Sequence, residues 1–203
     1  MTQLSAKHLI IGGGIIGCSI AYHLTRMGEK DVVLLERASL TEGATWHAAG
    51  LVGQLRSSRN TTRMLKKSVE MYDRLQNKEG MRFDWKKTGS LRLAVTHDRM
   101  LEARRLATMA RSFDLEMEII SPAEAKVLFP LIEQKGLQGA AYIPSDGYVD
   151  PASLCQAIAR AARNQGANIR QGVEVTDFTI HDGRITYVET TAGRFDVQNV
   201  ILA

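Results

Sequence analysis

The sequence predicts an α/β fold that begins with two parallel buried strands joined by a helix, and three observations support it. His8–Ile11 and Asp31–Leu35 are short, mainly apolar runs, as expected of buried strands. Ile15–Met27, between them, spaces its apolar residues along one helical face, and Gly28 ends the pattern. Gly12–Gly14 turn the chain between the first strand and the helix. Two strands and a helix in about 30 residues form a βαβ unit with a parallel pair.

After this unit comes a long segment without a period, followed by a mixed region. Arg37–Gly53 is rich in Thr, Ala and Gly, and irregular segments of this length in compact domains are usually functional. Asn60–Gln76 returns to a helical pattern, and Gly89–Val95 alternates as a half-buried, antiparallel strand does. Asp98–Phe113 again has a helical stripe.

The remaining elements are predicted from caps and turns. Ser121-Pro122-Ala123-Glu124 is a capping box with proline at the first helical position, so a short helix should run towards Phe129. Leu137–Ile143 is a strand candidate, and Asp150-Pro151 opens a helix through Ala162. Val173–Ile180 and Ile185–Thr190 flank a turn and predict a hairpin.

Asn199–Ala203 is a last apolar strand. A buried parallel strand is a poor place for a domain to end, so we expect the chain to be truncated relative to the complete protein.

The composition is that of an ordinary globular protein. The chain has 203 residues, of which 44% are hydrophobic and 24% charged. The net charge of +4 is mild, and no dense Lys/Arg block with interleaved aromatic residues is present. We therefore expect no nucleic-acid partner, while an acidic small substrate is compatible with the charge.

The termini and cysteines indicate a reducing compartment. Cys18 and Cys155 lie far apart in sequence, without a CxxC motif, and do not make a disulfide framework. The polar stretch Met1–Lys7 is too short for a cleavable targeting peptide, and no apolar run reaches the ~20 residues of a membrane span. We expect a cytoplasmic protein without a membrane partner.

The glycine-rich turn has the spacing of a dinucleotide-binding loop. Gly12, Gly14 and Gly17 match GxGxxG, between an apolar strand and a helix. The first glycine permits the tight turn, the second allows close approach of a diphosphate, and the third allows close packing of helix on strand. The helix N-terminus offers free N–H groups to the diphosphate. Glu36, which closes the second strand, can accept hydrogen bonds from a ribose diol and would repel a 2′-phosphate, which disfavours NADP.

The fingerprint alone does not separate FAD from NAD, but the next segment favours FAD. Gly43–Leu51 reads GATWHAAGL, and its small residues let the backbone approach a large flat ligand such as an isoalloxazine ring.

These motifs together resemble the dimethylglycine and sarcosine dehydrogenase family, within the D-amino-acid-oxidase-like flavoproteins. The resemblance rests on GGGIIG, VVLLER and GATWHAAGL, and it continues through TGSLR at 88–92, LFPL at 128–131 and DGYVDP at 146–151. The WHAAG element is its most specific part.

The resemblance implies an FAD-binding Rossmann-like domain formed by residues 1–82 and 144–203, with a β-meander. Residues 83–143 would be an inserted part of an antiparallel substrate domain. The implied FAD contacts are made by the phosphate loop, the end of the second strand, the following loop and one later strand residue: Gly12, Gly14, Ile15, Ile16, Gly17, Glu36, Arg37, Gly43, Ala44, Thr45, Trp46, His47, Ala48, Ala49, Gly50, Leu51 and Val175. Ile15 and Ile16 would meet the diphosphate, Glu36 and Arg37 the adenosine, and the Val175 backbone the adenine.

In the family that the sequence resembles, the histidine of WHAAG is joined covalently to the flavin 8α-methyl group, and that position is His47 here. A loop histidine taken alone is more often an ordinary hydrogen-bonded residue. Relatives with a similar loop bind FAD noncovalently, so both modes of binding stay open.

The implied reaction is oxidation of an N-methyl amine such as dimethylglycine or sarcosine by hydride transfer to flavin N5. An imine forms and is hydrolysed or captured by tetrahydrofolate, and an electron-transfer partner is implied for the dehydrogenases. Two alternatives remain: an amine or amino-acid oxidase that reduces O2, and a noncatalytic regulatory relative that keeps the flavin fold.

Several other polar residues have simpler explanations. Asp150 is expected to be a helix N-cap, and Asp146 to belong to a turn. Arg56 and Arg59 follow the flavin loop and are more often solvated than bound to a substrate carboxylate. His23 and His97 are expected at the surface, and no cluster has metal-ligand spacing. No catalytic acid or base is assigned.

Overall fold

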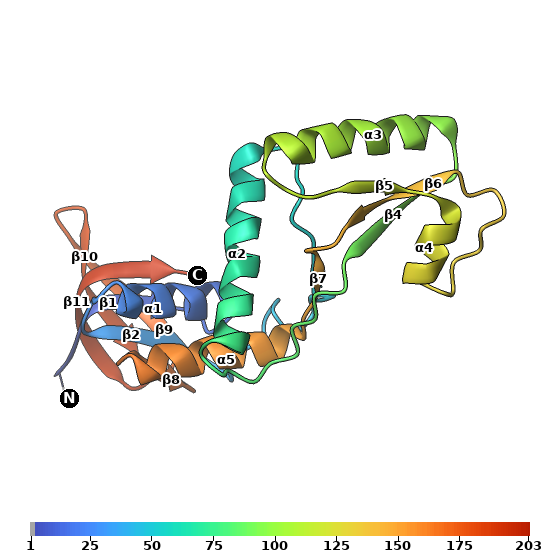
Figure 1. Ribbon diagram of the computed structural model, residues 1–203. Helices are drawn as coiled ribbons and strands as arrows, with labels where there is room; N and C mark the ends of the chain where they lie inside the picture. Colours follow the sequence, from blue (N-terminus) through green and yellow to red (C-terminus); the bar gives the residue numbers. More distant parts are fainter. Residues whose placement is uncertain (1–2) are drawn as a thin grey trace. The chain divides into compact units, whose positions relative to one another are not determined.

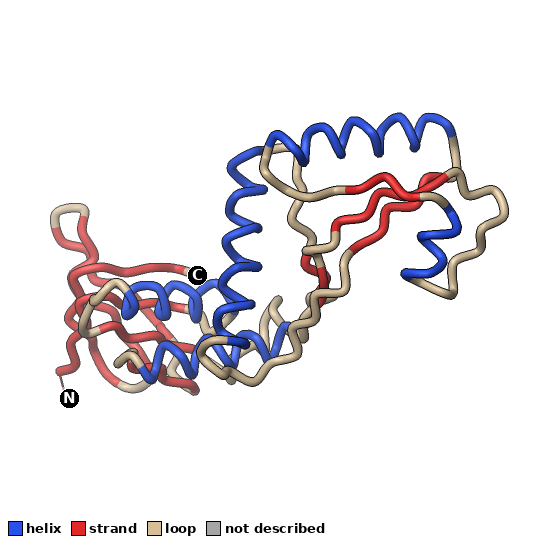
Figure 2. The backbone as a smooth tube through the Cα atoms, viewed as in Figure 1, coloured by secondary structure: helices blue, strands red, loops and turns tan. Residues whose placement is uncertain are grey.

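The computed structural model describes residues 3–203, which divide into two compact units (Figures 1 and 2). The first unit contains the residues up to Ala49, Met81–Asp84 and Asp150–Ala203; the second contains Gly50–Gly80 and Trp85–Val149. This division groups residues 50–80 and 144–149 with the insert, whereas the boundaries expected from the sequence were 1–82, 83–143 and 144–203. Those domain boundaries stay a prediction.

The first unit is built on one six-stranded sheet, in the order β8-β2-β1-β11-β10-β9. Its strands are β1 (Gln3–Ile11), β2 (Val32–Glu36), β8 (Asn168–Gln171), β9 (Val175–His181), β10 (Arg184–Thr190) and β11 (Gly193–Leu202). Strands β8, β2, β1 and β11 are neighbours in this order and pair in parallel. Strands β9, β10 and β11 form an antiparallel meander at one side of the sheet. The predicted α/β class, parallel βαβ unit and hairpin are confirmed.

Two helices accompany this sheet, α1 (Ile15–Arg26) and α5 (Pro151–Asn164), and they pack against each other. Small residues permit this contact, since Ala21 of α1 and Ala159 and Ala162 of α5 are fully buried. Helix α5 begins as predicted: the carboxylate of Asp150 accepts a hydrogen bond of 2.7 Å from Ser153 N, and proline follows the cap.

Both faces of the sheet are buried along Val32–Leu35 of β2 and at the end of β1, which explains why these stretches are apolar. Leu9 and Ile10, adjacent in β1 and therefore on opposite faces, are both fully buried. Val188 and Phe195 of the meander join the core cluster that contains Leu9. The meander is thereby part of the same hydrophobic core as the βαβ unit.

The second unit holds a three-stranded antiparallel sheet in the order β4-β6-β5, a two-stranded pair and three helices. Its elements are β3 (Leu51–Val52), α2 (Arg59–Asn77), β4 (Ser90–Ala94), α3 (His97–Ser112), β5 (Glu118–Ile120), α4 (Pro122–Leu128), β6 (Gly139–Ile143) and β7 (Gly147–Tyr148). The capping box predicted at Ser121 is present, with both reciprocal hydrogen bonds to Glu124.

Four short strands were not predicted: β3, β5, β7 and β8. Each has two to four residues, too few for a period to appear. The last strand was predicted too short, since β11 begins at Gly193 and alternates polar with buried residues such as Phe195 and Val197.

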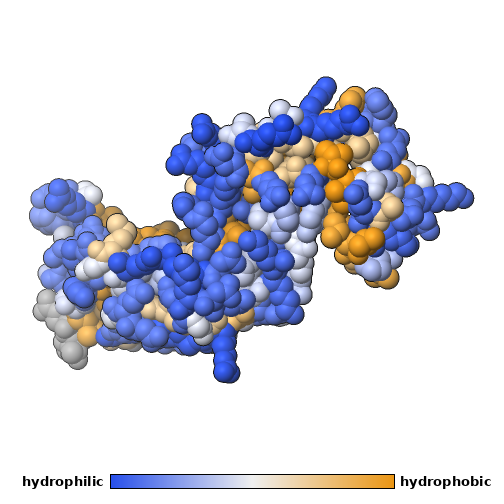
Figure 3. Space-filling view, in the orientation of Figure 1, coloured by the Kyte–Doolittle hydropathy of each residue, from blue (hydrophilic) through white to orange (hydrophobic). Residues whose placement is uncertain are grey.

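Apolar surface is exposed on the second unit around α4. Val127, Phe129 and Leu131 are 81%, 51% and 84% exposed, and Figure 3 shows hydrophobic surface over this part of the unit. Among residues 3–203, no helix combines the length and apolar character needed to cross a bilayer.

Candidate cofactor site

The candidate site lies at one edge of the first unit's sheet. Strands β1, β2, β8 and β11 are parallel, so their carboxyl ends share that edge. From β1 the chain crosses through α1 to β2 on one side, whereas β11, on the other side, comes from much later in the sequence. Ligands of open α/β sheets bind where strand order reverses in this way.

A pocket of about 280 Å³ opens at this edge. Its lining comes from the ends of β1, β2 and β11 and the start of β9: Ile11, Gly12, Leu35, Glu36, Arg37, Val173, Glu174, Val175, Leu202 and Ala203. Because ligand pockets usually measure roughly 300–1,000 Å³, this volume suits part of a dinucleotide rather than the whole molecule.

The phosphate loop has the geometry that its glycines predict. Gly12 has φ of +117°, a conformation that side chains strongly disfavour. A Cβ on Gly17 would overlap the carbonyl oxygen of Gly12, so only glycine lets α1 begin this close to β1. A Cβ on Gly14 would meet only Thr45 Oγ1, at 3.1 Å, which leaves the remaining approach to this loop open.

Two of the loop N–H groups already have protein partners. Gly13 N donates to Glu36 Oε2 at 2.7 Å, and Ile15 N donates to Thr45 Oγ1 at 3.0 Å. Within residues 3–203, the N–H groups of Gly14 and Ile16 have no protein acceptor, and the Ile16 side chain is 63% exposed. These two amides at the start of α1 are the donors available to a diphosphate.

Glu36 organises both sides of this loop. Its Oε1 accepts a hydrogen bond of 2.9 Å from Ala38 N, while its Oε2 accepts the bond from Gly13 N. Each carboxylate oxygen has a second lone pair, so Glu36 can also accept hydroxyl donors from a ribose. Its neighbour Arg37 is exposed and lines the same pocket.

The loop after β2 begins with ordered turns and is mostly exposed. Leu40 and Thr45 are buried in it, at 2% and 8% exposure, whereas Trp46 is 63% exposed. His47 is exposed, its Nδ1 lies 3.1 Å from Gly43 O, and its ring stands edge-on to Trp46 with centroids 5.2 Å apart. Ala44, Ala48 and Ala49 are exposed as well. In the described part of the chain, the ring nitrogens of His47 therefore have no hydrogen-bond partner beyond this one contact.

The last two residues predicted for this loop lie in the other unit. Gly50 O accepts from Val149 N at 2.9 Å, and Leu51 begins β3 and pairs with Tyr148. The other predicted contacts in the loop lie in the first unit, as does Val175. Val175 begins the edge strand β9, where alternate backbone groups lack a sheet partner and can bind a base edge.

Thr45 acts as a helix cap from a distant point in the sequence. The N-cap residue of α1 is Gly14, which has no side chain to accept a hydrogen bond, and the Thr45 hydroxyl takes that role for Ile15 N. Its own proton stays available to a phosphate oxygen. The family resemblance implied Thr45 as a contact, but the capping role required the tertiary structure.

We expect Thr45→Val, which keeps the side-chain shape, to leave the Ile15 N–H without an acceptor. The free energy of unfolding should fall by about 1–2 kcal/mol, the usual cost of losing a cap. Denaturant titration measures this loss. Thr61→Val, at an exposed position of α2, is the matched control and should change stability by no more than about 0.5 kcal/mol. Equal free energies of unfolding for the two variants would contradict a capping role for Thr45.

Asp146 was interpreted as a turn residue, and its N–H does close a turn on Ile143 O, at 3.3 Å, but its side chain is also a buried hub. Its side chain is only 2% exposed and accepts hydrogen bonds from Gln54 N, Gln54 Nε2 and Ser90 Oγ, at 2.9, 3.0 and 2.7 Å. The carboxylate thus connects the end of β3 to β4. An Asp-Gly pair in sequence does not distinguish this role from an exposed turn.

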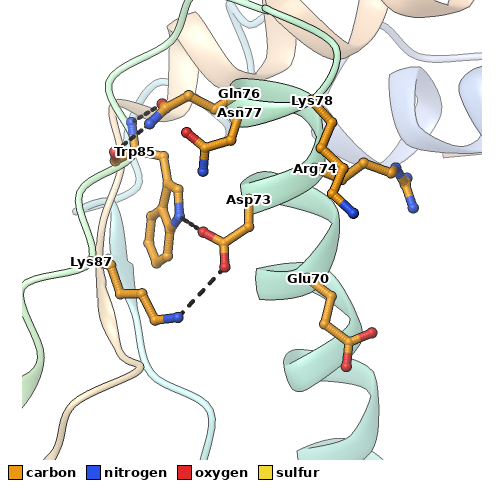
Figure 4. A pocket seen from close by; sticks show the side chains of 8 residues that line it. All are labelled: Glu70, Asp73, Arg74, Gln76, Asn77, Lys78, Trp85 and Lys87. Atoms are coloured by element: carbon orange, nitrogen blue, oxygen red, sulfur yellow. Dashed lines mark hydrogen bonds and ion pairs between the residues drawn. The ribbon is translucent and has the colours of Figure 1, made fainter.

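A larger pocket, of about 600 Å³, lies on α2 in the second unit (Figure 4). Asp73 accepts from Trp85 Nε1 at 2.8 Å and faces Lys87 Nζ at 3.6 Å, and Gln76 bonds to both backbone groups of Trp85. Burial raises the pKa of Tyr72, whose ring packs edge-on against Trp85. The polar groups of Asp73, Gln76 and Trp85 are thus hydrogen-bonded to one another, and these bonds hold the chain after α2 in place.

The two arginines after the flavin loop do not converge. Arg56 donates to Leu55 O at 2.8 Å. Arg59 lines a separate pocket of about 400 Å³ with Arg63, Lys66 and Lys67. Among residues 3–203, no group of three or more His, Cys, Asp or Glu side chains is arranged to hold a metal.

The comparisons with known proteins point to flavoproteins. The family described as FAD dependent oxidoreductase matches residues 7–203. Human mitochondrial sarcosine dehydrogenase is 37% identical over 205 residues, and rat mitochondrial dimethylglycine dehydrogenase 36% over 198 residues. These alignments cover 97% and 98% of this chain, but only 22% and 23% of the two dehydrogenases, so the chain spans about a fifth of their length.

Two further likenesses bear on function. The regulatory subunit of mouse mitochondrial pyruvate dehydrogenase phosphatase is 37% identical over 193 residues, which are 95% of this chain and 22% of that protein. The crystal structure of L-proline dehydrogenase from P. horikoshii superposes with a TM-score of 0.93 at 29% identity, covering 100% of this chain and 53% of that one.

Proposed function

The chain belongs to the family of FAD-dependent oxidoreductases, and on that basis we propose that it forms the nucleotide-binding part of an enzyme that oxidises N-methyl amines. The observation that carries the cofactor part is the loop of Gly12–Gly17, whose N–H groups at Gly14 and Ile16 are free beside a pocket lined by Glu36.

The residues present fit FAD. Gly14 and Ile16 would donate to the diphosphate, helped by the partial positive charge at the start of α1. Glu36 would accept from the adenosine ribose, with Arg37 beside it, and the backbone of Val175 would meet the adenine. The exposed small residues of the loop at 43–49 would lie against the flavin. When bound, FAD would supply a two-electron acceptor for a substrate C–H bond.

We propose a covalent link from His47 to the flavin 8α-methyl group. The exposure of the ring supports it, because both the imidazole and its neighbour Trp46 are open to a ligand. The contact between Nδ1 and Gly43 O supports it too: in a neutral imidazole, a carbonyl partner keeps the proton on Nδ1 and leaves the Nε2 lone pair free. Nε2 would form the new N–C bond as the 8α-methyl carbon loses a proton, and the flavin itself would take up the two electrons.

The covalent link predicts that flavin colour stays with the polypeptide after acid precipitation. In His47→Ala, the colour should move from the pellet to the supernatant, while the folded protein still binds FAD noncovalently. His97→Ala, at an exposed position at the start of α3, is the matched control and should keep its colour in the pellet. Wild-type protein that releases all its colour into the supernatant would exclude the link.

The substrate class is proposed from the two dehydrogenases that share over a third of this sequence. The amine must be neutral when its hydride leaves, because a protonated nitrogen cannot stabilise the developing cation. The experiment is anaerobic mixing of the complete flavin-loaded protein with sarcosine or dimethylglycine, with loss of flavin absorbance as the readout. Tetrahydrofolate and an electron-transfer partner are proposed only for the complete protein, as is a cytoplasmic location; the two dehydrogenases are named as mitochondrial.

Two other functions are distinguished by a peroxide measurement during aerobic turnover and by the bleaching experiment. An enzyme that passes electrons to O2 would form stoichiometric hydrogen peroxide during turnover, whereas a dehydrogenase would not. A noncatalytic regulatory role is favoured by one observation, the 37% identity to a phosphatase regulatory subunit. In that case the protein would bind FAD, and no secondary or tertiary N-methyl amine would bleach it.

A further inference from the structure

Two cysteines that are far apart in sequence meet beneath the phosphate loop. Cys18 lies near the start of α1 and Cys155 near the start of α5, and these two helices pack side by side (Figure 1). Both side chains are fully buried. Their sulfurs contact the same atom, the carbonyl oxygen of Gly13, at 3.6 Å from Cys18 and 3.8 Å from Cys155.

The two thiols also bond to each other, and this contact makes them unequal. The hydrogen bond from Cys18 lowers the pKa of Cys155, whereas the same contact and burial raise the pKa of Cys18. The S–H of Cys18 has two acceptors, the Gly13 carbonyl and the sulfur of Cys155. Two thiols in contact, one of which ionises more readily than the other, can close to a disulfide through a sulfenic acid.

We propose that Cys155 and Cys18 form a peroxide-sensitive modification site that closes to a disulfide between α5 and α1. The thiolate of Cys155 attacks one oxygen of hydrogen peroxide, forming a sulfenic acid and releasing hydroxide. The sulfur of Cys18 then attacks the sulfenic sulfur, and water leaves with the Cys18 proton. Two thiols are oxidised while one peroxide is reduced to two waters.

Burial defines which oxidant can act. Because both side chains are fully buried, the site would favour a small neutral oxidant such as hydrogen peroxide over a bulky disulfide such as oxidised glutathione. The disulfide would also change the phosphate loop. It has no S–H donor, so the Gly13 carbonyl would lose both sulfur contacts and keep the hydrogen bond from Thr41 N, at 3.2 Å.

The consequence for the cofactor rests on the proposed function. Gly13 lies between Gly12 and Gly14 in the loop that would hold the diphosphate, and its N–H is bound to Glu36. Loss of the sulfur contacts at the Gly13 carbonyl should disturb both the loop conformation and the hydrogen bond from Gly13 N to Glu36. We expect oxidation to weaken FAD binding about tenfold, the factor for losing one or two modest hydrogen bonds.

The site is tested on the folded protein. Hydrogen peroxide should remove two hydrogen atoms from the intact mass and abolish both free thiols under denaturing conditions, and dithiothreitol should reverse the change. Oxidised glutathione should have no effect. Cys18→Ser, which keeps a hydrogen-bond donor towards Cys155, should stop at a sulfenic acid on Cys155 that dimedone traps once the oxidised protein is unfolded in its presence, whereas Cys155→Ala should leave Cys18 unreacted. Two free thiols after peroxide treatment of the wild-type protein, or dimedone capture at Cys18 alone, would overturn the proposal.

The coupling to the cofactor is measured separately, by titrating FAD into reduced, oxidised and re-reduced protein. The expected result is a weaker affinity that dithiothreitol restores. An oxidised protein with unchanged affinity would overturn the coupling. If the reduced protein binds no FAD at all, the proposed function fails, while the mass measurement still decides whether the disulfide forms.

Discussion

Replacement of Gly17 by alanine is expected to remove FAD binding and to destabilise the first unit by at least about 3 kcal/mol, above the usual cost of overpacking. Alanine favours a helix interior by about 1 kcal/mol over glycine, so propensity alone predicts a gain. The added Cβ, however, would overlap the carbonyl oxygen of Gly12, a backbone atom that cannot rotate away. Relief of this overlap must move α1 away from β1, and the free N–H groups of the loop move with it.

Denaturant unfolding and FAD fluorescence titration measure the two effects of Gly17→Ala. Gly43→Ala is the matched control for stability, because a Cβ there has nothing within 4 Å and Gly43 has no positive φ. Its free energy of unfolding should stay within about 0.5 kcal/mol of wild type. If Gly17→Ala is as stable as Gly43→Ala, the close approach of α1 to β1 is not required.

Glu36→Gln should weaken FAD binding about 100-fold, although the side chain keeps its size. Both carboxylate oxygens accept from backbone N–H groups, of Gly13 and Ala38. An amide has one oxygen, so its NH2 group must face one of these donors and leave it unsatisfied. Charge-assisted hydrogen bonds are roughly twice as strong as neutral ones, and about 2.7 kcal/mol of lost interaction corresponds to this factor.

Equilibrium titration with FAD tests this prediction. Glu42→Gln, on an exposed position in the loop after β2, removes the same charge without touching either amide and serves as the control. Equal affinities of the two variants would mean that the net charge of the edge, and not the contacts of Glu36, governs binding.

Much of the first unit could be predicted because its signals are local. The apolar runs of β1 and β2, the glycine loop and the acid at the end of β2 stand close together in sequence, and each has a physical role there. The caps at Asp150 and Ser121 were predicted for the same reason, since a cap involves residues three positions apart. The short strands β3, β5, β7 and β8 are defined by their partners and left no local signal.

The sequence by itself determined the α/β class, the phosphate loop and the family, because glycine spacing and strand–helix alternation act over a few residues. Only the tertiary structure decided which distant side chains meet that loop. Thr45 caps α1 across 30 positions, Asp146 is buried between two strands, and Cys18 and Cys155 share one carbonyl across 137 positions of chain. Contacts of this kind depend on how whole elements pack, and packing joins residues whose separation in the sequence carries no period to detect.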